Sequence, residues 1–338
     1  MNAEKHIFPA LAAFAWLVVS APAQQSLDTA YRTTGAEVVA AFERQREVLQ
    51  TSSAVIQQGR KQLAYGVVIS ADGAILTKAS EVDGVSGLSV LVDRQTFRDV
   101  EVVMVDPVWD VALLRVDADD LVPVEFIETD AADLPQGTWV VANGATSRFA
   151  RRAMAGVISA NARPIPAAGG AVLGVVLKVT DDGLRVESVV EGSGAERAGL
   201  KEGDILVAVD DMEVANPEDI VEAMGERSAG EFIGIRYMRD HEEIEVDVPL
   251  IAREELFAEQ MMTRNDMMSG DFSKRRSGFP RVIQHDILGN SSSVGGPLLD
   301  LDGRCVGMNI ARANRAESFA IPAAEVQDIA ARLMGEKP

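Results

Sequence analysis

The sequence predicts a mainly β protein built from antiparallel barrels, and three observations lead to this fold class. Short apolar runs follow one another closely from residue 52 onward, and turn signals such as Asp72-Gly73 separate them. No helical pattern interrupts the first series of runs, which is typical of an antiparallel barrel. A second series begins with "TWVVANG" and "RRAMAGVISA", so we expect a second barrel of the same kind.

The length and the charge of the chain narrow the classes of function. Its 338 residues are enough for two or three domains. The formal net charge of −20 argues against nucleic acid, or an anionic membrane, as the main partner. The run "GSGAERAG" superficially matches a phosphate loop, but Arg197 occupies the place of the third glycine and no βαβ pattern surrounds it. We therefore expect no cofactor and no metal.

The first 23 residues have the pattern of a secretory signal. Lys5 gives a positive start, Ile7 to Val19 is apolar, and Ala21-Pro22-Ala23 is an A-x-A cleavage signature. We expect an exported protein, periplasmic or extracellular, that contacts a membrane only if this segment stays uncleaved. The one cysteine, Cys305, has no internal partner for a disulfide and is predicted to be a small buried strand residue.

The elements that follow are predicted in chain order. Segment 24–50 is expected to be helical, because apolar residues between Ala36 and Val48 share one face. Segment 51–166 is expected to hold the first part of the barrels, beginning with a hairpin of "SSAVIQQ" and "QLAYGVVIS" around a turn at Gly59. The series continues in "AILT", "GLSVLV", "RDVEVVMVD" and "DVALLRV".

Near the end of the chain, a tight turn at Gly295-Gly296-Pro297 leads into the apolar pair Leu298-Leu299. Asp302-Gly303 predicts a hairpin into a strand over Cys305 to Ile310, and a third short strand ends at "FAIP".

These pieces together resemble a trypsin-like serine protease of the HtrA/Deg type. In that family a strand ending Leu-Thr continues with Asn, any residue and the catalytic His; here "ILTKASEV" places Ser80 at the His position. The family's Asp-Pro-x-x-Asp pattern matches "DPVWDVALL", which retains the orienting acid as Asp110. The residue before Gly-Gly-Pro is the nucleophilic serine in the family and Val294 here. The resemblance implies a two-barrel chymotrypsin fold that keeps one of three catalytic residues.

The same loop contains candidates for substitute catalytic residues. Ser291, Ser292 and Ser293 are candidate nucleophiles, because an alternative alignment treats Asn290-Ser291 as the remnant of the family's Gly-Asn-Ser. A serine nucleophile needs a general base within hydrogen-bond reach. None of the three histidines, His6, His241 and His285, falls in the first barrel, where the family places that base, and Lys78 is the remaining candidate.

Segment 167–252 resembles a PDZ domain inserted into the second barrel, whose remainder follows a linker in 253–338. The resemblance rests on Ala195 to Asp210 and on a helix that starts at Pro217. Insertion is tolerable because loops accept long insertions at small entropic cost. The resemblance implies a carboxylate-binding loop, made of Val172, Leu173, Gly174 and Val175. It also implies an apolar pocket on the facing helix, made of Ile220, Val221 and Met224.

The predicted function is therefore that of an exported pseudoprotease. Its PDZ-like domain is expected to bind peptides, unfolded segments or protein C-termini. Two alternatives stay open: an active serine endopeptidase rewired around Ser291 to Ser293, and an oligomeric scaffold or chaperone. A homo-oligomer fits either alternative.

Overall fold

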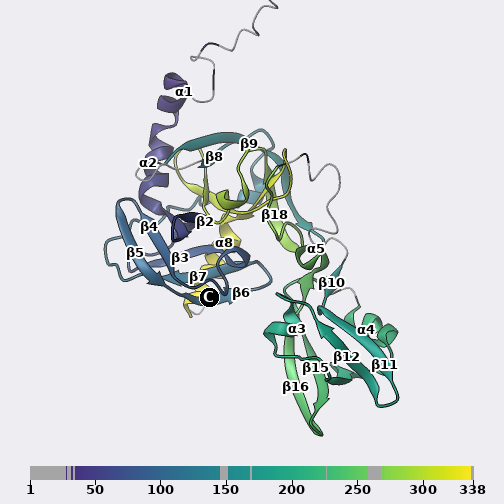
Figure 1. Cartoon of the computed structure of the whole chain (residues 1–338). Coiled ribbons are helices and arrows are strands. Elements are labelled where there is room, and N and C mark those ends of the chain that lie inside the picture. Colours follow the sequence, from purple (N-terminus) through teal and green to yellow (C-terminus); the bar gives the residue numbers. More distant parts are fainter. Residues whose placement is uncertain are drawn as a thin grey trace, which may run out of the picture. The chain divides into compact units, whose positions relative to one another are not determined.

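The structure is a computed structural model that describes residues 28, 32, 35–144, 151–167, 170–225, 227–257, 268 and 270–335 (Figure 1). The predicted signal segment, 1–23, lies outside these residues. The chain divides into two compact units, 1–41 and 42–338. None of the helices described is long and apolar enough to span a bilayer.

The predicted N-terminal helix is present as two helices. In the first unit, α1 is Ala36–Ala41; in the second, α2 is Glu43–Ser52. α2 continues two residues beyond the predicted end at residue 50, because Leu49 and Ser52 are buried and anchor its last turn. Ser53 then adopts an extended conformation and starts the first strand.

The first series of strands forms a seven-stranded antiparallel sheet in the order β5-β4-β1-β2-β3-β7-β6. The predicted first hairpin is confirmed, since Gln58 pairs with Lys61 across a turn in which Gly59 has φ 61°. The strands are β1 (Ser53–Gln58), β2 (Lys61–Val68), β3 (Ala74–Lys78), β4 (Leu88–Val92), β5 (Gln95–Val100), β6 (Val102–Asp106) and β7 (Val111–Arg115), with the 3-10 turn η2 (Ala79–Glu81) after β3.

The run "RDVEVVMVD", which we expected to be one strand, contributes to two. Glu101 separates β5 from β6, and these strands lie at the two opposite edges of the sheet. The chain continues from one edge to the other without reversing, so no glycine or proline marks the boundary.

The second barrel is closed, in the order β18-β21-β20-β19-β8-β9. Strands β8 and β9 precede the inserted segment in the sequence, and the other four strands follow it. The barrel is therefore assembled from two distant parts of the chain (Figure 1). The strands are β8 (Trp139–Asn143), β9 (Ala153–Ile165), β18 (Phe279–His285), β19 (Pro297–Leu299), β20 (Cys305–Arg312) and β21 (Ser318–Pro322), with 3-10 turns η3 (Ala131–Asp133) and η4 (Ser291–Ser293).

The inserted segment has a sheet and an apolar core of its own. Its sheet runs β11-β12-β13-β15-β16, with β14 paired to β13, and β10 pairs with β17 where the segment begins and ends. The strands are β10 (Ala171–Val172), β11 (Val175–Thr180), β12 (Gly183–Val189), β13 (Ile205–Val209), β14 (Met212–Glu213), β15 (Phe232–Arg239), β16 (Glu242–Pro249) and β17 (Ile251–Ala252). The helices are α3 (Gly194–Arg197), α4 (Pro217–Met224) and, after β17, α5 (Arg253–Leu256).

The predicted helix of this segment is confirmed, and its start has a local cause. Pro217 occupies the first turn of α4, and the side chain of Asn216 accepts a hydrogen bond from the Asp219 N–H (3.1 Å). The Asp219 carboxylate in turn accepts from the Asn216 N–H (3.1 Å), which completes a capping box.

The C-terminal helix α8 (Ala323–Met334) was not predicted. Val326, Ile329, Ala330 and Leu333 are buried and lie on one face at helical spacing. Gly335 ends the helix with φ 74°. Its buried side chains join the apolar core that includes β3, β7 and β20.

Candidate functional site

Asp110 lies in the turn before β7 with a left-handed backbone (φ 58°) and is only 3% exposed. Its Oδ1 accepts a hydrogen bond from the Ser80 backbone N–H (2.7 Å), and its Oδ2 accepts one from the Ser80 hydroxyl (2.9 Å). Its carbonyl oxygen accepts a bond from the Ala79 N–H (2.8 Å). The carboxylate therefore caps η2, and the structure brings Asp110 and Ser80 into direct contact.

Lys78 adds a contact that we did not predict. Its side chain is fully buried, and its Nζ forms an ion pair with Asp110 Oδ2. The same Nζ donates to the Arg275 carbonyl (3.0 Å) and lies 5.7 Å from the centre of the Phe279 ring. The ammonium partner of a buried ion pair has no lone pair with which to accept a proton. Lys78 therefore neutralises Asp110 and is not placed to act as a base.

The sequence carries a partial signal for this contact. Lys78 directly follows the apolar run "AILT", which is typical of a buried strand, and a lysine is almost never fully buried unless it is paired. The sequence therefore indicates that Lys78 needs an anionic partner, but it does not show that this partner is Asp110.

The surroundings of this pair carry further charge. Arg275 is 5% exposed and donates to the carbonyls of Pro107 (2.5 Å), Val108 (2.8 Å) and Gly278 (2.8 Å). Burial raises the pKa of Glu81, although the positive charge of Lys78 acts to lower it. Burial also raises the pKa of Glu255, and the negative charge of Asp110 adds to that rise. Both cationic groups and carboxyl groups therefore surround Asp110. No histidine is among the groups that contact it in the described structure.

The three candidate serines lie in η4, where their hydroxyls serve the loop itself. Ser292 Oγ and Ser293 Oγ both donate to Asn290 Oδ1, at 2.9 and 2.8 Å. Ser291 Oγ donates to the Asp271 carboxylate (2.5 Å). No histidine or lysine accepts a proton from any of these hydroxyls in the part of the chain that the structure describes. The loop therefore lacks the hydrogen bond that would activate a serine.

Val294 is 3% exposed and lies where the seven-stranded sheet meets the closed barrel. Its carbonyl accepts a hydrogen bond from the Tyr65 N–H of β2 (2.8 Å). The next residue, Gly295, has φ 85°, and a Cβ there would lie 2.2 Å from the Tyr65 carbonyl oxygen and 3.2 Å from the backbone nitrogen of Lys78. The loop therefore lies directly beside the end of β3, next to Lys78.

His285, at the end of β18, is a structural residue. Its Nδ1 accepts from the Ile287 N–H (3.3 Å), so its Nε2 carries the proton and donates to Asn309 Oδ1 (2.7 Å). It is 2% exposed, and burial lowers its pKa to about 4. Both ring nitrogens are occupied inside the barrel. His241 lies in the turn between β15 and β16 with φ 68°, and His6 falls outside the described residues.

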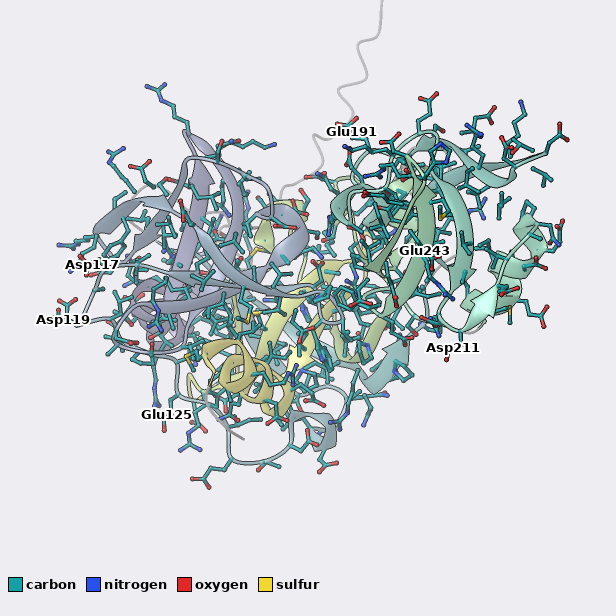
Figure 2. The ribbon with its side chains drawn as sticks, turned by 90° about the horizontal axis from the view of Figure 1, so that it is seen from below. Asp117, Asp119, Glu125, Glu191, Asp211 and Glu243 are labelled. Atoms are coloured by element: carbon teal, nitrogen blue, oxygen red, sulfur yellow. The ribbon has the colours of Figure 1, made fainter. Side chains whose placement is uncertain are left out.

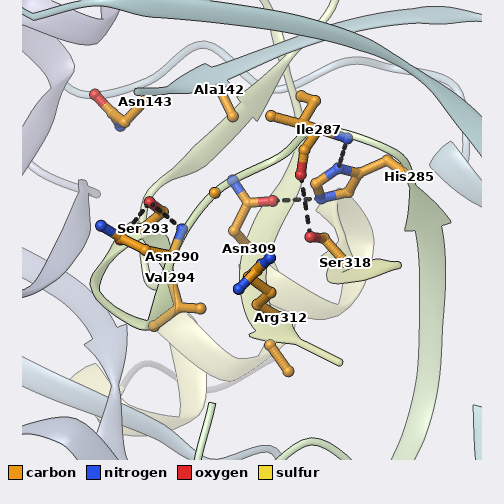
Figure 3. Close-up of a pocket in the computed structure, with 12 residues that line it drawn as sticks. Ala142, Asn143, His285, Ile287, Asn290, Ser293, Val294, Asn309, Arg312 and Ser318 are labelled. Atoms are coloured by element: carbon orange, nitrogen blue, oxygen red, sulfur yellow. Dashed lines mark hydrogen bonds between the residues drawn. The ribbon is translucent and has the colours of Figure 1, made fainter. Parts of the chain in front are cut away.

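A small pocket adjoins this histidine (Figure 3). Val294 and Ser293 line one side, while His285, Asn309, Arg312 and Ser318 line another. The Ser318 hydroxyl donates to the Ile287 carbonyl (3.2 Å). The hydrogen bonds drawn in Figure 3 join lining residues to one another, so these polar groups maintain the pocket wall.

The prediction for Cys305 is confirmed. The residue is fully buried in β20, and burial raises the pKa of its thiol to about 12. A thiol of this kind stays protonated and is not a nucleophile at neutral pH.

The predicted carboxylate-binding residues begin in β10 with Val172, pass through the turn of Leu173 and Gly174, and end at Val175, the first residue of β11. The other three predicted residues lie in α4, and β11 is an edge of the inserted sheet. Among the described strands, only β12 pairs with β11, so the other edge of β11 is unpaired. Val175, Leu177 and Met224 pack, half-buried, against the core of this segment. Ile220 belongs to the core itself, whereas Val221 is 72% exposed.

Gly174 occupies the turn between β10 and β11. It has φ 84°, and a Cβ there would lie 2.2 Å from the Ser193 Cβ. Its carbonyl accepts from the Val190 N–H (2.8 Å), and the neighbouring Leu173 carbonyl accepts from the Ala195 N–H (3.1 Å). Glycine is therefore required here by packing inside the domain as well as by the backbone conformation.

Comparison with known proteins identifies both parts of the chain. A sequence model described as a trypsin-like peptidase domain matches residues 64–195, and one described as a PDZ domain matches 171–250. A protein of Marinomonas sp. (strain MWYL1), named "Probable periplasmic serine endoprotease DegP-like", is 25% identical over 277 residues, covering 58% of this chain and 59% of that protein. A protein of the same name from Pseudomonas fulva (strain 12-X) is 34% identical over 110 residues, covering 32% of this chain and 22% of the relative. The chain is an HtrA/Deg-like protein.

The structure refines the domain boundary of this HtrA-like chain. The two matched ranges overlap over residues 171–195. In the structure, β11 and β12 belong to the sheet that contains β13, β15 and β16, so the overlap is part of the PDZ domain. The alignments span 59% and 22% of the two relatives, so the activity in their names cannot be transferred whole to this chain.

Proposed function

We propose that this HtrA-like protein is exported, has lost proteolytic chemistry and binds the C-termini of other proteins through its PDZ domain. The observation that supports the loss of proteolytic chemistry is the pairing of Asp110 with Lys78 and Ser80. In a serine protease the orienting acid holds a histidine that accepts the serine proton. Here the acid is occupied by a buried lysine, and Val294 stands at the nucleophile position suggested by the family pattern.

The proposal of export rests on the signal pattern in residues 1–23. It agrees with the word "periplasmic" in the names of the two relatives.

The proposal of peptide binding rests on the unpaired edge of β11. An extended peptide adds a strand to such an edge, and its main-chain hydrogen bonds supply affinity. The half-buried apolar side chains beside that edge, Leu177 and Met224, offer a surface for an apolar last residue. Backbone N–H groups of the loop 172–175 are suited to hold the terminal carboxylate.

Titration calorimetry with paired peptides tests the binding proposal. A peptide with a free apolar C-terminus should bind with micromolar affinity, about −8 kcal/mol. Its amidated version should bind at least about tenfold more weakly, because the donors that hold the carboxylate lose their charged partner. Met224→Glu should weaken binding by placing a charge at the apolar surface.

Met212→Glu is the matched control, because Met212 is 37% exposed on β14, a strand that pairs with β13 rather than β11. It should bind as the wild type does. Equal affinity for the free acid and the amide would refute carboxylate recognition, and equal losses in the two methionine variants would place the site elsewhere.

A further inference from the structure

The charge of the chain is concentrated in its PDZ domain. Residues 171–250 contain 20 acidic and 7 basic residues, so this domain carries −13 of the net −20. The acidic side chains come from separate elements: Glu191 follows β12, Asp211 lies before β14 and Glu243 lies in β16 (Figure 2). A domain with this balance creates a negative potential over its surface and attracts cationic ligands.

The structure also fixes the direction in which a bound tail crosses this domain. If the terminal carboxylate is held by the loop before Val175, the tail runs antiparallel to β11. β11 is six residues long and ends at Thr180. Residues of the tail about five or six positions before its C-terminus therefore reach the end of β11, since paired strands advance equally per residue.

Acidic residues lie where that path reaches the end of β11. Asp181 and Asp182 are exposed in the turn after Thr180, and Asp182 also forms an ion pair with Arg185 (3.1 Å). Asp181 makes no side-chain hydrogen bond or ion pair within the described part of the domain.

One basic residue lies on β11 itself. Lys178 is exposed, whereas its neighbour Leu177 packs against the domain core. Because side chains alternate along a strand, Lys178 projects from the face opposite the one that contacts α4. The end of β11 therefore presents two acidic residues, and the one basic residue of β11 lies on the other face of the sheet.

We propose that the ligand of this domain is a protein tail that ends in a free apolar residue and carries several Lys or Arg residues about four to seven positions upstream. The proposal rests on the function proposed above and adds the class of ligand. The apolar end and the carboxylate anchor the tail at the start of β11, and the basic segment lies against Asp181 and Asp182 at its other end.

Fluorescence anisotropy with the full chain tests this proposal. Three labelled ten-residue peptides share one free apolar C-terminal tripeptide and carry Lys, Gln or Glu at four upstream positions; an amidated Lys peptide completes the set. At 50 mM NaCl the Lys peptide should bind about tenfold more tightly than the Gln peptide, and the Glu peptide most weakly. At 500 mM NaCl the Lys and Gln peptides should differ less than about twofold.

Two charge-matched double variants locate the effect. Asp181→Lys with Asp182→Lys should bring the Lys and Gln peptides to within about twofold at low salt. Glu245→Lys with Asp247→Lys makes the same change in net charge on exposed positions of β16, the opposite edge of the sheet, and should retain most of the preference.

The outcomes separate the two proposals. Equal binding of the Lys, Gln and Glu peptides, with the amide still weaker, refutes the basic tail and leaves C-terminal recognition standing. Equal binding of free acid and amide refutes C-terminal recognition itself. Equal loss of preference in both double variants refutes the placement of the basic segment along β11.

Discussion

Asp110→Asn is expected to lower the free energy of unfolding by about 3–5 kcal/mol, because it leaves a fully buried ammonium without its counter-charge. The Lys78 side chain has no access to water, and its remaining partner is the Arg275 carbonyl. Lys78→Met removes the cation, and the combined Lys78→Met, Asp110→Asn variant should recover much of the loss, since a buried pair replaced as a unit leaves no isolated charge. Urea unfolding of the wild type and the three variants gives the coupling between the two residues.

The exposed pair Arg115–Asp72 is the control. Its side chains are 44% and 69% exposed, so Asp72→Asn should unfold at nearly the same urea concentration as the wild type. If Asp110→Asn also unfolds at the wild-type urea concentration, the ion pair does not stabilise this part of the sheet.

Gly174→Ala is expected to destabilise the PDZ domain by about 3 kcal/mol and to abolish peptide binding with it. The positive φ costs an L-residue about 1–2 kcal/mol, and the clash with Ser193 adds an overpacking cost of about 1–3 kcal/mol. Thermal unfolding followed by circular dichroism measures the loss.

Gly192→Ala separates the two causes in the same domain. Gly192 has φ 75°, and a Cβ there has no neighbour within 4 Å. This variant should lose only about 1–2 kcal/mol, from the backbone conformation alone. If the two alanine variants lose the same stability, the contact with Ser193 contributes nothing, and Gly174 matters for its φ only.

Much of this fold could be predicted because its signals are local. The hairpin at Gly59 and the start of α4 at Pro217 follow from turn and capping residues within a few positions. The boundary at Glu101 left no such signal, because the chain passes between edges of a curved sheet without reversing. α8 also has a local signal, because Val326, Ile329, Ala330 and Leu333 recur at helical spacing.

The site was predictable in its positions but not in its contacts. The family pattern aligned Ser80, Asp110 and Val294, and the structure places Ser80 against Asp110 and the Val294 loop beside β3. The pairing of Lys78 with Asp110 depends on how β3 and the turn before β7 approach one another in the folded sheet. Nor does sequence spacing show that Asn290 and Asp271 accept hydrogen bonds from the hydroxyls of Ser291 to Ser293.

Casein hydrolysis by the purified full chain tests the central claim of lost proteolysis most directly. We expect intact unfolded casein after prolonged incubation, since losing the serine or the histidine costs a serine protease about a million-fold in turnover. Ser80→His with Val294→Ser should remain inactive while Lys78 holds Asp110. Adding Lys78→Asn, the residue that the family pattern carries there, should free Asp110 to orient the new histidine and yield weak cleavage. Cleavage by the wild type that disappears in Ser291→Ala, Ser292→Ala or Ser293→Ala would contradict the account.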